Sequence, residues 1–192
     1  MSRQRPVEPG CACPGRRRFL RGLAIGLPAV VVARRALAVD DCCESRRLYL
    51  INTHTGEELE ARYFEGGAYR PDQLGTLDWL LRDHRTGDIH SIEPRLLDLL
   101  HELAAAAGRE PRYEVISGYR SPATNALLAA TSDGVSGRSL HMEGRAIDVR
   151  LVGFPTIELR DLALARQAGG VGYYPVSDFV HLDTGSVRSW SG

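Results

Sequence analysis

The stretch Ser139-Leu140-His141-Met142-Glu143-Gly144-Arg145-Ala146-Ile147-Asp148 places an imidazole and a carboxylate seven positions apart. Both side chains can bind a divalent metal ion. Gly144 allows the chain to bend between them, so that His141 can lie in a loop and Asp148 on the strand that follows. Taken alone this spacing is a weak signal, because a histidine and an aspartate so placed are more often surface or structural residues.

A second imidazole comes later, in Asp178-Phe179-Val180-His181-Leu182-Asp183. A catalytic zinc site uses three protein ligands and keeps one position open, and two imidazoles with one carboxylate suit Zn²⁺ among the divalent metals. We therefore predict that His141, Asp148 and His181 converge on one zinc ion. The remaining histidines have no partner pattern and are interpreted as structural or solvated: His54, His84, His90 and His101.

The length of the chain, 192 residues, suits one domain. Hydrophobic residues make up 43% and charged residues 25%, a composition that supports a buried core and argues against a disordered chain. No run of 18 or more apolar residues is present, so the sequence holds no ordinary membrane span. The sequence also has no internal repeat that would indicate a second domain.

The N-terminus has the composition of an export signal. A basic segment, Arg16-Arg17-Arg18-Phe19-Leu20-Arg21, precedes an apolar segment at 22–33, and Ala36-Leu37-Ala38 has the small-x-small pattern of a cleavage site. Adjacent arginines before Phe-Leu resemble a bacterial twin-arginine signal. Residues 1–38 are therefore predicted to be a twin-arginine signal peptide that directs the protein to the periplasm or cell envelope. An uncleaved N-terminal anchor is the alternative.

Cleavage after residue 38 is expected to leave a flexible lead-in at 39–46 and a folded domain at 47–192, without a transmembrane helix. Residues 1–38 hold eight of the 24 basic and one of the 24 acidic residues, so the rest carries 16 basic and 23 acidic residues, a net charge of −7. A negative domain does not favour nucleic acid. The folded domain has no cysteine, which excludes a disulfide scaffold, while Cys42 and Cys43 leave an intermolecular bridge open.

Strand and helix patterns alternate irregularly along the folded domain. Apolar residues at helical spacing follow Pro71, fill 94–107 and recur at 156–168, and Pro122 opens a shorter helix. Strand composition is found at 47–53, 59–64, 113–116, 146–151, 171–174 and 179–183. Because no regular βαβ repetition is present, we predict an α+β fold: a single domain with a mostly antiparallel sheet, helices packed on it and the zinc site on the sheet.

Three motifs occur in a specific order: Ser117-Gly-Tyr-Arg120-Ser, then Ser139-x-His141-x-x-Gly-x-Ala-x-Asp148, then Phe-Val-His181-x-Asp183. Together they resemble the LAS-type zinc peptidases, a group that includes D-Ala-D-Ala carboxypeptidases, phage peptidoglycan endopeptidases and the hedgehog signalling domain. Within this group the chain is most similar to periplasmic murein endopeptidases exported by the twin-arginine route. The likeness covers roughly residues 46–190 and is strongest from Ser117 onward.

The resemblance implies roles for individual residues. His141, Asp148 and His181 match the zinc ligands. Arg120 matches an arginine that binds substrate and can stabilise an oxyanion, and Ser139 matches a residue that contacts substrate near the metal.

The general base is the position where the match to these relatives is imperfect. Many of them have a glutamate three positions before the last zinc histidine, whereas this chain has Asp178, which is one methylene shorter. Others use a histidine two positions before that ligand, and here Phe179 cannot serve. Asp178 is predicted to be the catalytic base, with a turn-capping role as the alternative. Asp183 is interpreted as a partner that orients His181 through its second nitrogen.

The resemblance implies a zinc-dependent peptidase that hydrolyses the stem-peptide crosslinks of murein (peptidoglycan), most simply an endopeptidase. Peptidoglycan stem peptides are the expected partner, and their carboxylates suit a local arginine in an acidic domain. Two alternatives stay open. One is a catalytically inactive, zinc-bearing cell-wall binding module, and the other is a metal-free structural protein.

Overall fold

A computed structural model describes residues 44–131 and 136–192. The predicted signal peptide, residues 39–43 of the predicted lead-in, and Cys42 and Cys43 lie outside the described residues. The first strand begins at Ser45, so the ordered domain starts two residues before the predicted boundary at residue 47. Within the described part of the chain, no helix is both long enough and apolar enough to cross a membrane.

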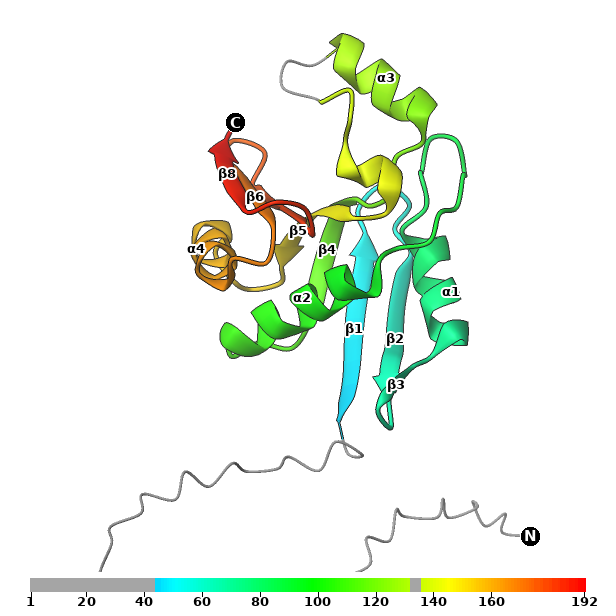
Figure 1. The fold of residues 1–192 in the computed structure, drawn as a ribbon, viewed down its shortest axis with the longest axis vertical. Coiled ribbons are helices and arrows are strands. Elements are labelled where there is room, and N and C mark those ends of the chain that lie inside the picture. The colour runs from blue at the N-terminus through cyan, green and yellow to red at the C-terminus, as the bar shows by residue number, and fades with distance from the viewer. Residues whose placement is uncertain (1–43, 132–135) are drawn as a thin grey trace, which may run out of the picture. The chain divides into compact units, whose positions relative to one another are not determined.

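The described residues form one eight-stranded sheet with helices around it (Figure 1). The strand order is β3-β2-β1-β4-β5-β7-β6-β8. The strands are β1 (Ser45–Asn52), β2 (Glu58–Glu65), β3 (Ala68–Tyr69), β4 (Arg112–Ser117), β5 (Ala146–Leu151), β6 (Gly170–Tyr174), β7 (Phe179–Asp183) and β8 (Arg188–Ser191). The helices are α1 (Pro71–Leu80), α2 (Pro94–Ala106), α3 (Pro122–Thr131) and α4 (Thr156–Arg166), with a 3₁₀ helix, η2 (Leu140–Glu143).

The sheet is mostly antiparallel. Five neighbouring pairs run antiparallel, namely β1–β2, β2–β3, β4–β5, β5–β7 and β6–β7, whereas β1–β4 and β6–β8 run parallel. The parallel pairing of β1 with β4 follows from the long crossover through α1 and α2 that separates them. The predicted α+β class with a mostly antiparallel sheet is confirmed.

The hydrophobic core lies between the sheet and the helices. Helix α2 buries five leucines, and each buried leucine stabilises the fold by roughly 2 kcal/mol. Figure 1 shows α2 lying across β1, β4 and β5, and α4 beside β6. The sheet contributes alternate residues to this core, such as Ile147 and Val149 from β5 and Val180 and Leu182 from β7.

The same alternation decides where the polar residues of these strands point. Successive side chains of a strand face opposite sides of the sheet. Asp148 lies between Ile147 and Val149, and His181 lies between Val180 and Leu182. Because those neighbours belong to the core, both polar side chains emerge on the face of the sheet away from it.

Three elements were absent from the sequence prediction: the short strand β3, the C-terminal strand β8 and the 3₁₀ helix η2. The two residues of β3 are too few to show periodicity, and β8 is a polar segment, Arg188-Ser189-Trp190-Ser191. Figure 1 places η2 and α3 together at one end of the sheet, beside the connection between α1 and α2. All other predicted strands and helices are present.

Candidate metal centre

Asp148 and His181 are brought together by the sheet itself. They are direct partners in the antiparallel pairing of β5 with β7, and the same register pairs Ser117 of β4 with Asp148. Residues that face each other across an antiparallel pair have side chains on the same side of the sheet and in contact. The sheet register therefore supplies two of the three predicted ligands without any loop.

His141 comes from η2, just before β5. Ser139 precedes this short helix, and its hydroxyl accepts a hydrogen bond from the His141 backbone N–H at 3.4 Å. Gly144 ends the helix with φ 65°, in the left-handed region that favours glycine. A Cβ at Gly144 would also lie 2.1 Å from the Ser91 carbonyl oxygen. The bend that returns the chain from His141 into the sheet therefore requires glycine for two reasons.

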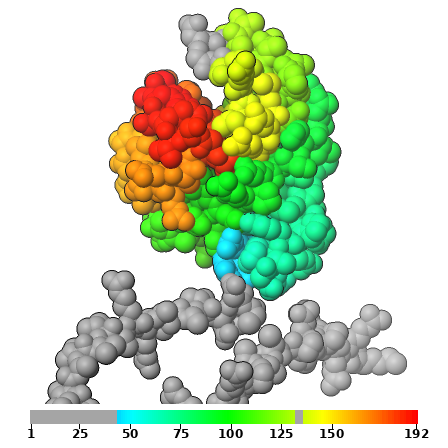
Figure 2. All heavy atoms as spheres, viewed as in Figure 1, coloured from blue at the N-terminus to red at the C-terminus, as the bar shows by residue number. Residues whose placement is uncertain are grey.

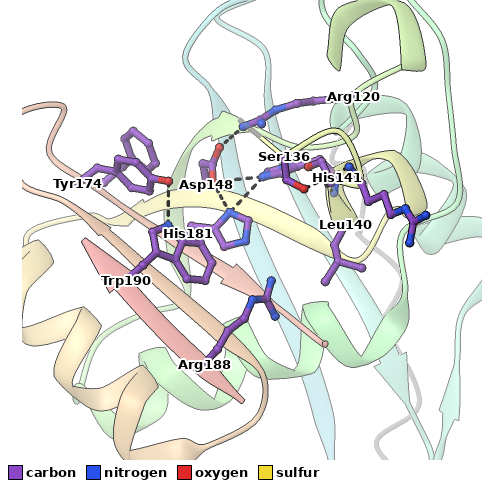
Figure 3. Close-up of a pocket in the computed structure, with 12 residues that line it drawn as sticks. Arg120, Ser136, Leu140, His141, Asp148, Tyr174, His181, Arg188 and Trp190 are labelled. Carbon is purple, nitrogen blue, oxygen red and sulfur yellow. Dashed lines mark hydrogen bonds and ion pairs between the residues drawn. The ribbon is translucent and has the colours of Figure 1, made fainter. Parts of the chain in front are cut away.

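The three side chains converge through one nitrogen or oxygen atom each (Figure 3). His141 Nε2 lies 3.2 Å from His181 Nδ1 and 3.3 Å from Asp148 Oδ1. His181 Nδ1 lies 2.8 Å from Asp148 Oδ1. His141 and Asp148 are buried, at 1% and 3% exposure, and the His181 side chain is 12% exposed.

The remaining polar atoms of the cluster are held by other partners. His141 Nδ1 lies 2.7 Å from the Gly118 carbonyl oxygen, which can only accept, so Nδ1 carries the hydrogen and Nε2 faces the cluster with a lone pair. His181 Nε2 lies 3.2 Å from Asp183 Oδ2, which leaves Nδ1 for the cluster. Arg120 Nη2 donates to Asp148 Oδ2, which leaves Oδ1. Each predicted ligand is thus held in orientation by a hydrogen-bond partner at the atom that does not face the cluster, as metal ligands usually are.

The pKa values of the cluster follow from burial and mutual contact. Burial lowers the pKa of His141 below its usual value, against the pull of Asp148. Burial also lowers the pKa of His181, but hydrogen bonds to Asp148 and Asp183 outweigh it and raise that pKa to about 9. For Asp148, burial raises the pKa, yet the neighbouring histidines outweigh it and hold the pKa well below its usual range. Asp148 is therefore an anion at neutral pH.

These atoms fit a bound divalent metal ion. Two nitrogens and one oxygen at about 2.0–2.1 Å from a tetrahedral zinc ion would lie about 3.3–3.4 Å apart. The observed separations of 2.8 to 3.3 Å match this triangle after a shift of a few tenths of an ångström. With both imidazoles neutral, as a metal complex requires, the set carries the single negative charge of Asp148, and the ring nitrogens Nε2 of His141 and Nδ1 of His181 are directed inward. The cluster can therefore hold a metal through three protein atoms.

The cluster opens into a cavity of about 550 Å³. One side of this cavity is formed by Ser136 to His141 and the other by the C-terminal strand β8. Figure 2 shows these two parts, in yellow and red, facing each other across a hollow in the surface. The lining residues are Arg120, Ser136, Arg138, Ser139, Leu140, His141, Asp148, Tyr174, Phe179, His181, Arg188 and Trp190.

Both predicted substrate-binding residues line this cavity. The Arg120 guanidinium donates through Nε to Ser117 Oγ at 2.7 Å and through Nη2 to Asp148. With the described residues as partners, three of its five N–H donors remain for a ligand. Ser139 lies at the start of η2, where its oxygen accepts from the His141 backbone, and no described residue accepts its own O–H. The structure therefore brings Arg120 and Ser139 beside the three predicted ligands.

Asp178 is not brought to this cavity. It lies in the turn before β7 with φ 52°, and its Oδ1 accepts a hydrogen bond from Thr156 Oγ1 at 2.6 Å, at the start of α4. Arg150 donates to the Asp178 carbonyl oxygen and lies 3.6 Å from its carboxylate. This geometry fits the turn-capping alternative, and a catalytic role for Asp178 stays a prediction.

Several lining residues were missed by the sequence analysis. Trp190 packs beside His181 with ring centroids 5.1 Å apart and donates its Nε1–H to the Tyr174 hydroxyl at 2.9 Å. Arg188 binds the buried Asp183 carboxylate at 2.7 Å. Both come from β8, whose pairing with β6 is not encoded by a local pattern. Gly172 makes room for Trp190, since a Cβ there would lie 2.6 Å from its ring.

Tyr119, Tyr173 and Tyr174 divide between lining the cavity and packing on the core. Tyr174 lines the cavity and stacks on Phe179 with ring centroids 4.5 Å apart. Tyr173 and Tyr119 pack against the core, and Tyr119 also stacks on His90.

Comparison with known proteins identifies relatives over nearly the whole chain. The peptidoglycan L,D-endopeptidase MepK of Escherichia coli (strain K12) is 41% identical over 175 residues, which cover 91% of this chain and 96% of the relative. The probable peptidoglycan L,D-endopeptidase MepK of Haemophilus influenzae is 39% identical over 174 residues, 90% of this chain and 92% of the relative. No solved structure matches the chain.

A family model described as peptidoglycan L,D-endopeptidase MepK matches residues 40–190. The match spans the sheet up to Trp190 in β8 and every lining residue of the cavity. It confirms the resemblance to the LAS-type peptidases, which are metal-dependent. The chain belongs to the family of peptidoglycan L,D-endopeptidases described by MepK.

Proposed function

We propose that this protein is a zinc-dependent peptidoglycan endopeptidase that hydrolyses stem-peptide crosslinks, with the L,D specificity that its relatives' names carry. The observation behind the proposal is the convergence of His141 Nε2, His181 Nδ1 and Asp148 Oδ1 within 3.3 Å of one another at the base of an open cavity. Membership of a peptidoglycan endopeptidase family supports the same conclusion.

Zinc is the metal we assign to this site. Two imidazole nitrogens and a carboxylate oxygen, with room for a fourth ligand on the cavity side, are the donor set of catalytic zinc sites. When bound, zinc supplies Lewis acidity toward a carbonyl oxygen and lowers the pKa of water to about 7. His141, Asp148 and His181 are the residues that would hold it.

The remaining residues of the cavity bind and orient the peptide. Arg120 offers N–H donors to a substrate carboxylate or to the oxygen of the scissile carbonyl as negative charge develops there. Ser139 offers its O–H from the rim of η2. Arg188 and Arg138 add positive charge to the same cavity, which suits stem peptides because these carry carboxylates. A cationic cavity in an acidic domain concentrates such a substrate at the site.

The proposed hydrolysis also needs a proton acceptor. Asp178 is the residue predicted for it, and Asp178→Asn is the variant that tests the role. Catalytic hydrogen bonds are often formed only in the substrate complex, and in the free protein the Asp178 carboxylate is bonded to Thr156. Its carboxylate would have to leave that bond and turn toward the cavity.

Export by the twin-arginine route is part of the proposal. Its support is the sequence of residues 1–38, with the basic segment before an apolar segment and a small-x-small site. The substrate supports the location, because peptidoglycan lies outside the cytoplasmic membrane. The mature protein would begin near residue 39 and act in the periplasm or cell envelope.

Defined crosslinked muropeptides test the proposal directly. The purified protein should convert them to uncrosslinked products, lose this activity on treatment with a chelator and regain it on addition of zinc. Product masses identify the bond that is cut. Absence of products at full zinc occupancy would rule out the enzyme.

A zinc-bearing binding module without catalysis is the second candidate. One observation favours it: among the described residues that line the cavity, Asp148 is the only carboxylate, and Arg120 and the predicted metal already engage it. Such a module would bind the same muropeptides in a zinc-dependent manner and release them unchanged. The assay above separates the two functions, because only the enzyme generates products.

A further inference from the structure

Asp83 is a buried carboxylate outside the metal cluster. It follows α1, is 1% exposed and has no ion-pair partner among the described residues. Its Oδ1 accepts from the Arg85 backbone N–H at 2.9 Å, and its Oδ2 accepts from the Ser121 backbone N–H at 2.8 Å. An isolated buried charge is costly unless hydrogen bonds replace its lost hydration, so this residue has a strict structural requirement.

The charge state of Asp83 follows from its partners. Burial raises the pKa of its carboxyl, but hydrogen bonds from Thr124 and Ser121 outweigh burial and hold the pKa well below its usual range. Asp83 is therefore an anion that accepts from the backbone N–H groups of Arg85 and Ser121, with the hydroxyls of Ser121 and Thr124 as further donors. These two residues begin α3, so Asp83 joins the end of α1 to the start of α3.

The segment that Asp83 holds is the turn at residues 118–121. A second contact fixes the other end of this turn, because the Tyr119 N–H donates to the Leu81 carbonyl oxygen at 2.8 Å. The approach is close enough that a Cβ on Gly118 would lie 2.5 Å from the same oxygen. Leu81 and Asp83 thus fix the turn at both ends against the segment that follows α1.

This turn contacts two of the three predicted metal ligands. The Gly118 carbonyl oxygen accepts from His141 Nδ1–H at 2.7 Å, and the Arg120 backbone N–H donates to the His141 carbonyl oxygen at 3.2 Å. The Arg120 side chain reaches Asp148 Oδ2, as the dashed line in Figure 3 shows. One turn of four residues therefore orients a histidine ligand, a carboxylate ligand and the substrate-binding arginine.

We propose that Asp83 is a positioning residue for the metal centre. By fixing the turn at 118–121, it keeps the Gly118 carbonyl oxygen in its hydrogen bond with His141 Nδ1. It also keeps the Arg120 guanidinium in place between Asp148 and the cavity. Partners behind metal ligands contribute about 10- to 100-fold to metal affinity. The effect on metal affinity rests on geometry alone, while the effect on turnover rests on the proposed function.

The chain provides a matched control in Asp78. Its Oδ1 accepts a hydrogen bond from the Ile92 backbone N–H at 2.8 Å, so it holds the other end of the connection between α1 and α2 in the same way. Asp78 does not bond the turn at 118–121. Each of the variants Asp83→Asn and Asp78→Asn puts an isosteric amide in place of a carboxylate that accepts from the backbone. Only Asp83→Asn removes a carboxylate that holds the turn at 118–121.

The experiment measures zinc affinity of the full chain by competition with a chromophoric chelator, together with melting temperature and muropeptide hydrolysis. Asp83→Asn should weaken zinc binding about tenfold or more, lower kcat and raise KM, because an amide meets two converging N–H donors with a single oxygen. Asp78→Asn should change zinc affinity less than about twofold, even where it lowers the melting temperature.

A lower melting temperature in Asp83→Asn with unchanged zinc affinity and unchanged KM and kcat would overturn the proposal, because Asp83 would then be only structural. If Asp83→Asn does not fold, Thr124→Val removes one hydroxyl donor to Asp83 at constant volume and should shift zinc affinity in the same direction. Unchanged affinity in that variant would equally overturn it. A wild-type protein that binds zinc without hydrolysing muropeptides would refute the proposed function and leave the affinity comparison valid.

Discussion

Asp148 and His181 face each other directly across the antiparallel pairing of β5 with β7, with His181 Nδ1 2.8 Å from Asp148 Oδ1. The backbone register thereby fixes two residues that are 33 positions apart in the sequence. A slip of one residue between β5 and β7 would separate them, because it would turn one of the two side chains into the core. His141 joins them from a short helix at the edge of the cavity. Two of the three predicted ligands are therefore fixed by the sheet, and the third is fixed by η2.

Asp148→Ala should abolish zinc binding. The substitution removes one ligand atom and the only anion of the three, so zinc affinity should fall by more than about 100-fold. This loss exceeds the roughly 10- to 100-fold expected when a residue that only hydrogen-bonds to a metal ligand is replaced. Zinc content after gel filtration provides the measurement. Glu143→Gln is the control, since this exposed carboxylate in η2 pairs with Arg145. Full zinc occupancy in Asp148→Ala would remove Asp148 from the ligand set.

Asp183→Asn should weaken zinc binding without removing a ligand. The fully buried Asp183 carboxylate accepts from the Gly170 and Gly185 backbone N–H groups, Arg188 and His181. The variant leaves His181 Nε2 with a poorer partner, so affinity should fall about 10- to 100-fold. Asp161→Asn, an exposed carboxylate paired with Arg160, should leave affinity unchanged. Equal affinities in the two variants would show that Asp183 does not support His181.

Zinc affinity should rise with pH up to about pH 9. In the metal-free protein the pKa of His181 is raised to about 9, because Asp148 and Asp183 outweigh burial, so at neutral pH the imidazole carries a proton on the nitrogen that faces the cluster. Zinc must displace this proton. Affinity therefore falls as pH drops below 9, by about tenfold per pH unit, and levels off above it. Chelator competition over this range gives the slope.

Proton release provides an independent check of the same prediction. Addition of zinc to the metal-free protein near pH 7.5 should release about one proton per zinc from His181. An indicator dye in weakly buffered solution measures it. Asp183→Asn should reduce the release, because it removes one of the two carboxylates that raise the pKa. A pH-independent affinity without proton release would contradict the protonated state of His181.

Replacement of Arg16-Arg17 by Lys-Lys should leave the protein in the cytoplasm. The twin-arginine route requires the adjacent arginines, whereas the general secretory route accepts any basic residue before the apolar segment. Cell fractionation of tagged wild-type and variant chains gives the measurement. Arg34-Arg35→Lys-Lys, at the other end of the apolar segment, is the control. Normal export of the first variant would exclude the twin-arginine assignment.

The sequence predicted most of the fold because the relevant signals are local. Helix α2 follows from leucines at helical spacing between Pro94 and Gly108, and β5 and β7 follow from apolar residues on alternate positions. Strand β8 was missed because Arg188-Ser189-Trp190-Ser191 has no alternation. Its place in the sheet depends on Gly172, which lets the Trp190 ring lie against β6, and such a contact between distant segments leaves no local pattern.

For the site, the sequence predicted those residues that occur in short motifs. His141, Asp148, His181, Arg120 and Ser139 all lie at the cavity, because each occurs at a fixed distance from a turn or strand end. The supporting partners were largely missed. The role of Asp83 depends on the meeting of two loops 38 residues apart, and its local sequence, Leu-Arg-Asp-His-Arg, resembles an ordinary polar connection.

Asp178→Asn decides whether the predicted base takes part in catalysis. In the structure the carboxylate is bonded to Thr156 and lies outside the cavity. If Asp178 only caps this turn, Asp178→Asn should keep turnover within about twofold of wild type. A general base predicts a loss of about 100- to 10,000-fold in kcat with zinc affinity unchanged. Thr156→Val is the matched control, because it removes the same hydrogen bond and keeps the carboxylate. If Asp178→Asn is inactive and Thr156→Val is active, the carboxylate turns into the cavity when substrate binds. If both remain active, the proton acceptor is another group, and Asp178 stabilises the entry into β7.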